Sequence, residues 1–183
     1  MVALTKRMIV ILVLAAICTP MFAAEKNEHI KWIENSWLKS LKPKTVNTQR
    51  RGRPKVKYPE QDAYGAVNGK RNDRTGFHTD KAKISWWQVD LKKSYSISMI
   101  VISNREKNPE RAAKLEILLS RDGKYWTPAY KHNGTIFGGG RKKTKPLTVR
   151  LGGKSARYVR LQVRNNFLHL NWFGIFEYSQ VIF

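Results

Sequence analysis

Acidic residues and cysteine are scarce in this sequence of 183 residues. The chain has 13 Asp and Glu against 35 Lys and Arg, a formal net charge of +22, and residues 123–176 contain no acidic side chain. Its single cysteine, Cys18, excludes an internal disulfide. So large a positive excess attracts anionic partners of many kinds. With 42% hydrophobic and 11% aromatic residues, the chain is still expected to form one packed domain and not a disordered polymer.

Signatures of catalysis and of metal binding are also missing. No nucleophile turn of the Gly-x-Ser-x-Gly kind is present, and the long acid-free stretch limits where a pair of catalytic carboxylates could come from. The four histidines show no metal-ligand spacing: His29, His78, His132 and His169. We therefore expect a binding protein with no cofactor, and not an enzyme.

The N-terminus has the pattern of a signal peptide. Lys6 and Arg7 precede an apolar run from Met8 to Phe22, and polar residues begin at Glu25. We predict a signal peptide over residues 1–24 and a secreted or periplasmic protein. The lack of cysteine after it favours a bacterial source. The alternative is an uncleaved anchor, although the run is shorter than the roughly 20 residues of a spanning helix.

Residues 25–44 are predicted to form a short amphipathic helix and a basic linker. Apolar residues share one helical face at Ile30, Ile33, Trp37, Leu38 and Leu41. This helix would end before Pro43, and it could pack on the domain or bind a partner. Residues 42–57 then carry seven basic residues, no acidic residue and two prolines, which indicates an extended connection or an edge strand.

The hydrophobic period changes to two in the rest of the chain, which indicates strands. Core-facing positions are expected at Ile97, Met99 and Val101, at Leu115, Ile117 and Leu119, and at Val159, Leu161 and Val163. Asp122-Gly123 suits a hairpin and Gly152-Gly153 a second turn. Short strands with no long helix between them predict an antiparallel β-sandwich or barrel.

Several motifs occur in a fixed order. They are Ala-Val-Asn-Gly at 66–69, Gly-Phe-His-Thr at 76–79, Trp-Trp-Gln-Val-Asp-Leu at 86–91, Ile-Ser-Asn-Arg at 102–105, Leu-Leu-Ser-Arg-Asp-Gly at 118–123 and Ala-Arg-Tyr-Val-Arg-Leu-Gln at 156–162. Together they resemble the factor V/VIII type C domain, also called the discoidin domain, over residues 45–183. The resemblance implies an all-β, galactose-binding-like sandwich (jelly roll) that binds glycans, anionic lipids or proteins without catalysis.

One part of the sequence is similar to the fucose-binding F-type lectins, a branch with this fold. Their pattern has a His, then 26 residues, then Arg-x-Asp, then four residues and a basic residue. His78 and Arg105 have this separation, and Arg111 comes one residue early. Imidazole and guanidinium groups offer directed hydrogen bonds to sugar oxygens. Lys107 stands where the lectin pattern has Asp, which puts fucose itself in doubt.

An aromatic side chain, Phe77 or Trp86, would complete such a site by packing on the apolar face of a sugar. In the alternative interpretation, His78 only caps a loop and Arg105 is held in a buried ion pair. The candidate acids for that pair are Glu106, Glu110 and Asp90.

Two functions follow from these residues. The first is a carbohydrate-binding, lectin-like module, and the second is adhesion to anionic membrane surfaces or polyanions. The residues expected to bind polyanions are Arg50, Arg51, Arg53, Arg141, Lys142, Lys143 and Lys145. Calcium is disfavoured, because Asn68 and Asn171 stand in segments where the discoidin resemblance implies acidic ligands. Nucleic acid is not an expected partner, and the oligomeric state is left open.

Overall fold

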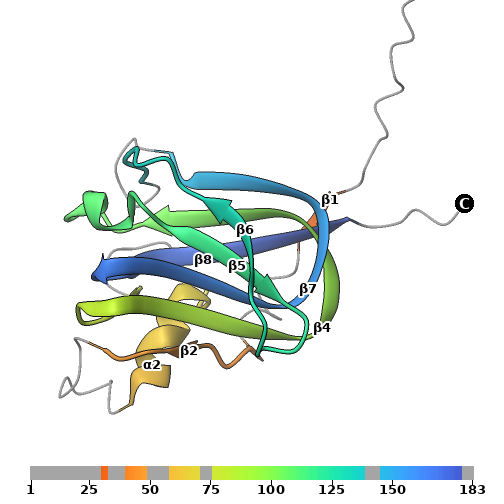
Figure 1. Cartoon of the computed structure of the whole chain (residues 1–183), viewed down its shortest axis with the longest axis horizontal. Coiled ribbons are helices and arrows are strands. Elements are labelled where there is room, and N and C mark those ends of the chain that lie inside the picture. The colour runs from red at the N-terminus through yellow and green to blue at the C-terminus, as the bar shows by residue number, and fades with distance from the viewer. Residues whose placement is uncertain (1–29, 33–39, 49–57, 71–75, 139–144, 179–183) are drawn as a thin grey trace, which may run out of the picture.

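The structure is a computed structural model that describes residues 30–32, 40–48, 58–70, 76–138 and 145–178 (Figure 1). Its strands are β1 (Ile30–Trp32), β2 (Lys44–Thr45), β3 (Phe77–His78), β4 (Ala82–Asn104), β5 (Glu116–Ser120), β6 (Thr127–Lys131), β7 (Leu147–Asn166) and β8 (His169–Tyr178). The helical segments are short: α2 (Pro59–Ala63), and the 3-10 turns η1 (Tyr64–Ala66) and η2 (Pro109–Ala112).

Two long, bent strands, β4 and β7, build both layers of a sandwich (Figure 1). Residues 82–90 of β4 pair with 158–166 of β7, and this layer continues through β2 on one side and through β5 and β6 on the other. Residues 95–102 of β4 pair with 147–156 of β7 and with β8, which also pairs with β1 and β3. All of these pairings are antiparallel. The predicted antiparallel β-sandwich is confirmed.

The register defines two ends of this sandwich. Ala82 lies opposite Asn166, and Asn104 lies opposite Leu170, so the segments 79–81, 105–115 and 167–168 gather at what we call the loop end. At the other end, which we call the bend end, β4 bends at 91–94, β5 turns into β6 at 121–126, and β7 bends at 152–155. The two ends use their charged residues in different ways.

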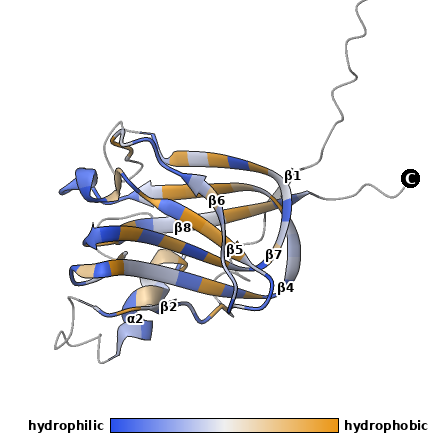
Figure 2. Ribbon diagram, viewed as in Figure 1, coloured by the Kyte–Doolittle hydropathy of each residue, from blue (hydrophilic) through white to orange (hydrophobic). Residues whose placement is uncertain are grey.

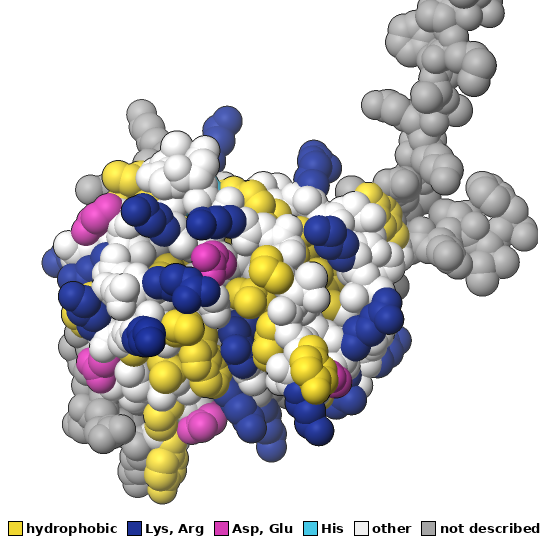
Figure 3. Space-filling model, viewed as in Figure 1, with side chains coloured by type: hydrophobic (Ala, Val, Ile, Leu, Met, Phe, Trp, Pro, Cys, Tyr) yellow, Lys and Arg dark blue, Asp and Glu magenta, His cyan; other side chains and the backbone are white. Residues whose placement is uncertain are grey.

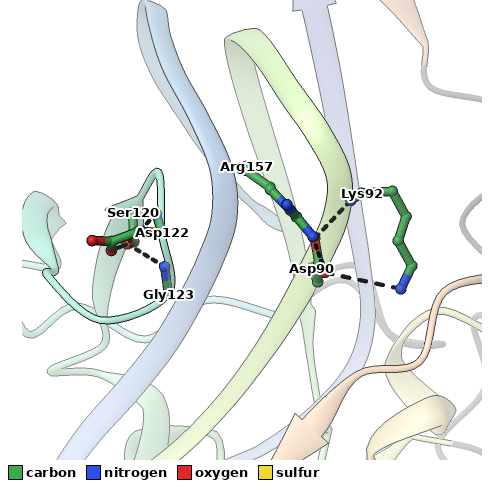
Figure 4. A network of polar contacts seen from close by, with 6 residues as sticks. All are labelled: Asp90, Lys92, Ser120, Asp122, Gly123 and Arg157. Carbon is green, nitrogen blue, oxygen red and sulfur yellow. Dashed lines mark hydrogen bonds and ion pairs between the residues drawn. The ribbon is translucent and has the colours of Figure 1, made fainter.

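The bend in β4 is held by a carboxylate (Figure 4). Asp90 accepts hydrogen bonds from Nε and Nη2 of Arg157 on β7, each at 2.9 Å, and from the backbone N–H of Lys92 at 2.7 Å. Lys92 itself has a left-handed φ of 70°. The Arg157 hydrogen bonds lower the pKa of Asp90, and burial of the carboxyl opposes them. This contact joins the bend to the neighbouring strand.

The β5–β6 hairpin confirms the turn predicted at Asp122-Gly123 (Figure 4). Gly123 has a φ of 75° and donates its N–H to Ser120 Oγ at 2.9 Å, and Ser120 Oγ in turn donates to Asp122 Oδ1 at 3.0 Å. The same carboxylate oxygen accepts the backbone N–H groups of Lys124 and Tyr125. These bonds lower the pKa of Asp122, so the ionised carboxylate is part of the turn.

The core is built on Trp87 of β4, which is fully buried. Its ring stacks on Phe77 at 5.9 Å and tilts against Phe173 of β8 at 5.0 Å. The indole N–H donates to the backbone oxygen of Ala63 at 2.9 Å, which ties α2 to the core. Figure 2 shows the corresponding alternation of apolar and polar bands along β4 and β7.

The predicted core-facing positions are confirmed in two strands, and in the third strand, β4, they shift by one residue after Ile97. The apolar positions of 115–119 and 159–163 are buried as expected. In β4, Ile97 is buried, but the next buried positions are Ile100 and Ile102, while Met99 and Val101 are half-exposed. The reason is a register shift between Ile97 and Met99, because an extra residue at a bulge moves every later side chain to the other face.

The second turn, predicted at Gly152-Gly153, is a bulge inside β7 and not a hairpin. Both glycines have positive φ, 63° and 80°, and they lie within the register shift between β7 and β4. A bulge with left-handed glycines bends the strand without ending its pairing. For this reason one long strand appears where the sequence predicts two.

Most of the N-terminal helix expected within 25–41 lies outside the described residues, and Ser40, near its expected end, is helical. The expectation is wrong for residues 30–32. Ile30–Trp32 is extended and pairs with Tyr178 to Phe176 of β8. Backbone groups at a sheet edge favour strand pairing over the weak helical preference of a short segment. The signal peptide over 1–24 lies outside the described residues. Further along, Lys44–Thr45 pairs with β4 as an edge strand, as one of the two interpretations of this basic segment predicts.

Candidate functional site at the loop end

His78 enters the loop end on a short, well-anchored strand. Its backbone N–H donates to Asp62 Oδ2 at 2.9 Å, and the same oxygen accepts a hydrogen bond from Thr48 Oγ1 at 2.8 Å. Next to it, the backbone N–H of Thr79 donates to Leu168 O, and the N–H of Leu168 donates to Thr79 Oγ1, both at 2.8 Å. These two hydrogen bonds between the loops fix the position of His78.

The tautomer of His78 follows from one contact. Its Nδ1 lies 2.8 Å from the backbone oxygen of Thr79, which can only accept a hydrogen bond. Nδ1 therefore carries the proton, and in the neutral ring the lone pair is on Nε2. The residue as a whole is 4% exposed, so His78 is buried in the domain as described.

Arg105 and Arg111 lie on the loop that connects β4 to β5, and a buried asparagine shapes this loop. Nδ2 of Asn104 donates to Pro109 O at 2.9 Å and to Phe137 O at 3.1 Å, while its Oδ1 accepts the N–H of Arg105 at 2.8 Å. The loop then turns through Asn108, which has a left-handed φ of 54°, into η2. Both arginines are thereby held at the loop end.

Arg111 reaches the segment that precedes β8. Its guanidinium carbon lies 4.4 Å from the centre of the Phe167 ring, a cation–π contact. Phe167 also meets the His78 ring edge-on at 5.9 Å, and His169 lies 5.1 Å from His78. Segments far apart in the sequence thus bring His78, Arg111, Phe167 and His169 into one cluster.

His169 forms the floor of this cluster and is fully buried. Neither ring nitrogen has a hydrogen-bond partner among the described residues. Burial lowers the pKa of His169 to about 3, and positive charge at His78, Arg105 and Arg111 lowers it further. The nearby backbone of Asn108 acts in the opposite direction and raises the pKa of His169, although its geometry falls short of a hydrogen bond. His169 is consequently neutral at physiological pH. Arg105 follows Asn104, which lies opposite Leu170 in the register of β4 and β8, so the two segments adjoin at the loop end.

No carboxylate of the described residues pairs with either arginine. Arg105 and Arg111 are half-buried and lie in none of the ion pairs between described side chains. Of the three acids that the alternative interpretation offers, Asp90 is bonded to Arg157 at the bend end, and neither Glu106 nor Glu110 forms an ion pair with Arg105 among the described residues. The predicted trio of His78, Arg105 and Arg111 is therefore brought together, without the buried ion pair.

The fold and this geometry can now be compared with known proteins. The family model described as the F5/8 type C domain matches residues 43–178, most of the chain. The chain belongs to the F5/8 type C domain family. This confirms the discoidin resemblance and the galactose-binding-like fold. No curated protein matches the chain in sequence.

Solved structures share the fold of this F5/8 type C domain at low identity. A Streptococcus pneumoniae fucose binding module is 21% identical, with a TM-score of 0.60 over 74% of this chain and 89% of that one. An f-lectin (fucolectin) from striped bass serum (Morone saxatilis) is 20% identical, with a TM-score of 0.65 over 83% and 50%. CpGH89CBM32-5 from Clostridium perfringens, in complex with GalNAc-β-1,3-galactose, is 17% identical, with a TM-score of 0.60 over 79% and 99%.

The two aromatic residues predicted for the site of this F5/8 type C domain do not join the cluster. Phe77 is 1% exposed and stacks on Trp87, since β3 turns this side chain into the core. Trp86 points to the outer face of β4, because side chains alternate along a strand and its neighbour Trp87 is buried. There Trp86 lies against Arg160, whose guanidinium also stacks on Trp126.

Phe167 and His169 are the cluster members that sequence reasoning missed. The segment Phe-Leu-His-Leu at 167–170 alternates in the manner of a strand, which accounts for Leu168 and Leu170 but predicts nothing for the residues between them. The pairing of His78 with His169 across β3 and β8 shows that the two histidines meet. Their separation in sequence carries no such signal.

Of the predicted polyanion-binding residues, only Lys145 lies among the described residues, where its side chain is exposed. Arg50, Arg51, Arg53, Arg141, Lys142 and Lys143 lie outside them. On the face shown in Figure 3, Lys and Arg side chains are spread over most of the surface, with few Asp and Glu between them. The described basic residues on this face thus form no single patch.

The described residues show neither a metal site nor a membrane span. No group of three or more His, Cys, Asp or Glu side chains among them is placed to hold a metal ion. Asn68, from the segment considered for calcium, accepts the N–H of Lys70 at 2.8 Å. Within the same part of the chain, no helix has the length and apolar character needed to cross a membrane.

A surface depression of about 510 Å³ lies away from the cluster, at the bend end. It is lined by residues of β5, β6 and the intervening turn, with Lys154 and Ser155 of β7. Its carboxylate, Asp122, is already bonded within the turn, and it contains no buried polar atom that lacks a partner. We therefore assign the candidate site to the loop end, where the arginines have no carboxylate partner among the described residues, and not to this depression.

Proposed function

We propose that the domain is a non-catalytic, lectin-like module that binds glycans at the loop end. The observation that carries this proposal is the convergence of His78, Arg105 and Arg111 around Phe167 and His169. These side chains come from three separate segments of the chain, and the hydrogen bonds of Asp62 and Asn104 hold two of those segments in place.

The chemistry of the cluster suits a sugar. Each guanidinium presents several N–H donors in a fixed plane, and such a fork matches adjacent sugar hydroxyls or a ring oxygen. The stacking of Arg111 on Phe167 holds its guanidinium plane against the ring. Because the side chains are already placed, little conformational entropy would be lost on binding.

The structural relatives support the same class of ligand. They include a fucose binding module, a lectin domain complexed with Lewis B antigen and a module bound to GalNAc-β-1,3-galactose. The likeness to them is one of fold, so the sugar bound by this chain has to be found by experiment. We further propose that the protein is secreted or periplasmic, on the strength of its N-terminal sequence.

A glycan array followed by calorimetry on the full chain tests the proposal. We expect the double variant His78→Ala/Arg105→Ala to weaken binding of the selected glycan by about 100-fold, since two directed polar contacts are lost. The His78 backbone N–H still donates to Asp62 in this variant, so the strand stays anchored. The control is Arg121→Ala/Lys154→Ala, two exposed cations at the bend end. Wild-type affinity in the first variant would refute the site.

Adhesion to polyanions or anionic membranes is the second candidate, favoured by the net charge of +22. It predicts binding to heparin or to vesicles containing anionic lipid that weakens steeply with added salt. Glycan binding at the loop end predicts, in addition, a loss of binding in His78→Ala/Arg105→Ala and none in Arg121→Ala/Lys154→Ala. Titrations of both variants with heparin, vesicles and the selected glycan separate the two functions.

A further inference from the structure

We infer that the glycan bound at the loop end carries a negatively charged substituent, a carboxylate or a sulfate ester. The inference rests on the proposed function, because it names the ligand class of the same site. It starts from the balance of charge around the cluster and not from the overall charge of the chain.

Two permanent positive charges at the site lack a counter-charge. Guanidinium groups do not lose their proton in proteins, so Arg105 and Arg111 stay cationic at every accessible pH. Neither has an ion-pair partner among the described residues. Lys107, exposed in the same loop, adds a third positive charge. The acids of this loop, Glu106 and Glu110, form no ion pair with either arginine.

The floor of the site does not compensate this charge. His169 is neutral, and the two permanently charged side chains that act on it, those of Arg105 and Arg111, are both cationic. Its two buried nitrogens have no hydrogen-bond partner among the described residues, which costs free energy in the unbound domain. A nearby carboxylate would raise the pKa of this histidine, and none contributes. The carboxylate that adjoins the cluster, Asp62, lies behind His78, where it accepts hydrogen bonds from the His78 backbone N–H and the Thr48 hydroxyl, and it pairs with neither arginine among the described residues.

A neutral sugar would leave these charges uncompensated, whereas an acidic one would neutralise them. Hydrogen bonds from guanidinium to carboxylate or sulfate are shorter and roughly twice as strong as those to neutral hydroxyls. Two planar forks on one cluster also suit the paired oxygens of such a group. At the bend end, by contrast, Arg157 already donates hydrogen bonds from Nε and Nη2 to the carboxylate of Asp90.

The experiment compares sugars that differ only in charge, by calorimetry with the full chain in 0.15 M salt. The pairs are D-galactose with D-galacturonate, and D-galactose with galactose 6-sulfate. We expect each acidic sugar to bind about tenfold more tightly than D-galactose. We expect the preference to shrink at least threefold in Arg111→Gln and to persist in Arg121→Gln, which removes the same charge from the bend end.

The outcomes separate this inference from the function on which it rests. Equal or tighter binding of D-galactose by the wild-type chain would refute the inference and leave glycan binding intact. An equal loss in Arg121→Gln and Arg111→Gln would also refute it, because the preference would then reflect net charge alone. If the chain binds no sugar in these titrations or on the array, the proposed function itself fails. The carboxylate and sulfate pairs together identify which acidic group the site prefers.

Discussion

The two ends of the sandwich treat their charged side chains in opposite ways. At the bend end, Asp90 accepts three hydrogen bonds from Arg157 and Lys92, and Asp122 is closed within its turn. At the loop end, Arg105 and Arg111 lack carboxylate partners among the described residues. Polar groups that are satisfied within the protein stabilise its bends, while those left unsatisfied are available to a ligand.

The largest effect is expected from Asn104→Ala at the loop end. This buried side chain bonds Pro109, Phe137 and Arg105, so its loss leaves backbone groups without partners and releases the arginine loop. We expect a loss of about 2 kcal/mol in the free energy of unfolding, measured by urea denaturation, together with weaker glycan binding. Asn133→Ala, in an exposed loop, is the control. Equal stability of the two variants would show that Asn104 does not hold the loop.

Gly123→Ala should damage the bend end alone. The residue has a φ of 75°, and a Cβ there would lie 3.3 Å from the Tyr158 ring. We expect a loss of about 1–2 kcal/mol from the left-handed backbone, with unchanged glycan affinity. Gly152→Ala, where φ is 63° and the space is open, measures the backbone cost without the ring contact. A fall in glycan affinity in the Gly123 variant would mean that the two ends are coupled.

Arg157→Gln should produce a smaller, pH-dependent effect. The side chains of Arg157 and Asp90 are 39% and 25% exposed, so solvent screening keeps the contribution of the pair small. Because Arg157 lowers the pKa of Asp90, this contribution is present above the ordinary value of 3.8 and is lost as the pH falls through the lowered folded-state pKa. A series of urea titrations from pH 7 downward through the acid range tests this. A stability difference that does not shrink as the pH falls would contradict the assignment.

The smallest effect, and one of opposite sign, is expected from His169→Leu. Leucine has nearly the same volume and removes two buried nitrogens that have no partner. We expect stability to rise by up to about 1 kcal/mol, because an unsatisfied polar group is replaced by an apolar one. Thermal unfolding of the variant and the wild type makes the comparison. A marked loss of stability would show that His169 has a partner that stabilises the fold.

Local patterns in the sequence predict the strands over 115–119 and 159–163 and the hairpin at Asp122-Gly123, while the trio of His78, Arg105 and Arg111 is suggested by the resemblance to F-type lectins and stays a prediction. They fail where long-range pairing decides the outcome. The bulge after Ile97 inverts the faces of β4, Gly152 and Gly153 bend one strand instead of joining two, and Ile30–Trp32 pairs with β8. Long-range pairing also explains why His169 and Phe167 could not be predicted, because the register of β8 and the loop before it bring them to the site.

The most direct test of the central claim is a nitrogen-15 nuclear magnetic resonance titration of the chain with a glycan that binds in calorimetry. The account predicts that the largest shifts occur at the loop end, at the backbone and Nε–H signals of Arg105 and Arg111 and at the backbone of His169. It also predicts that Asp122, Gly123 and Lys154 stay unchanged. Shifts centred on the depression at the bend end, with Arg105 and Arg111 unaffected, would contradict it.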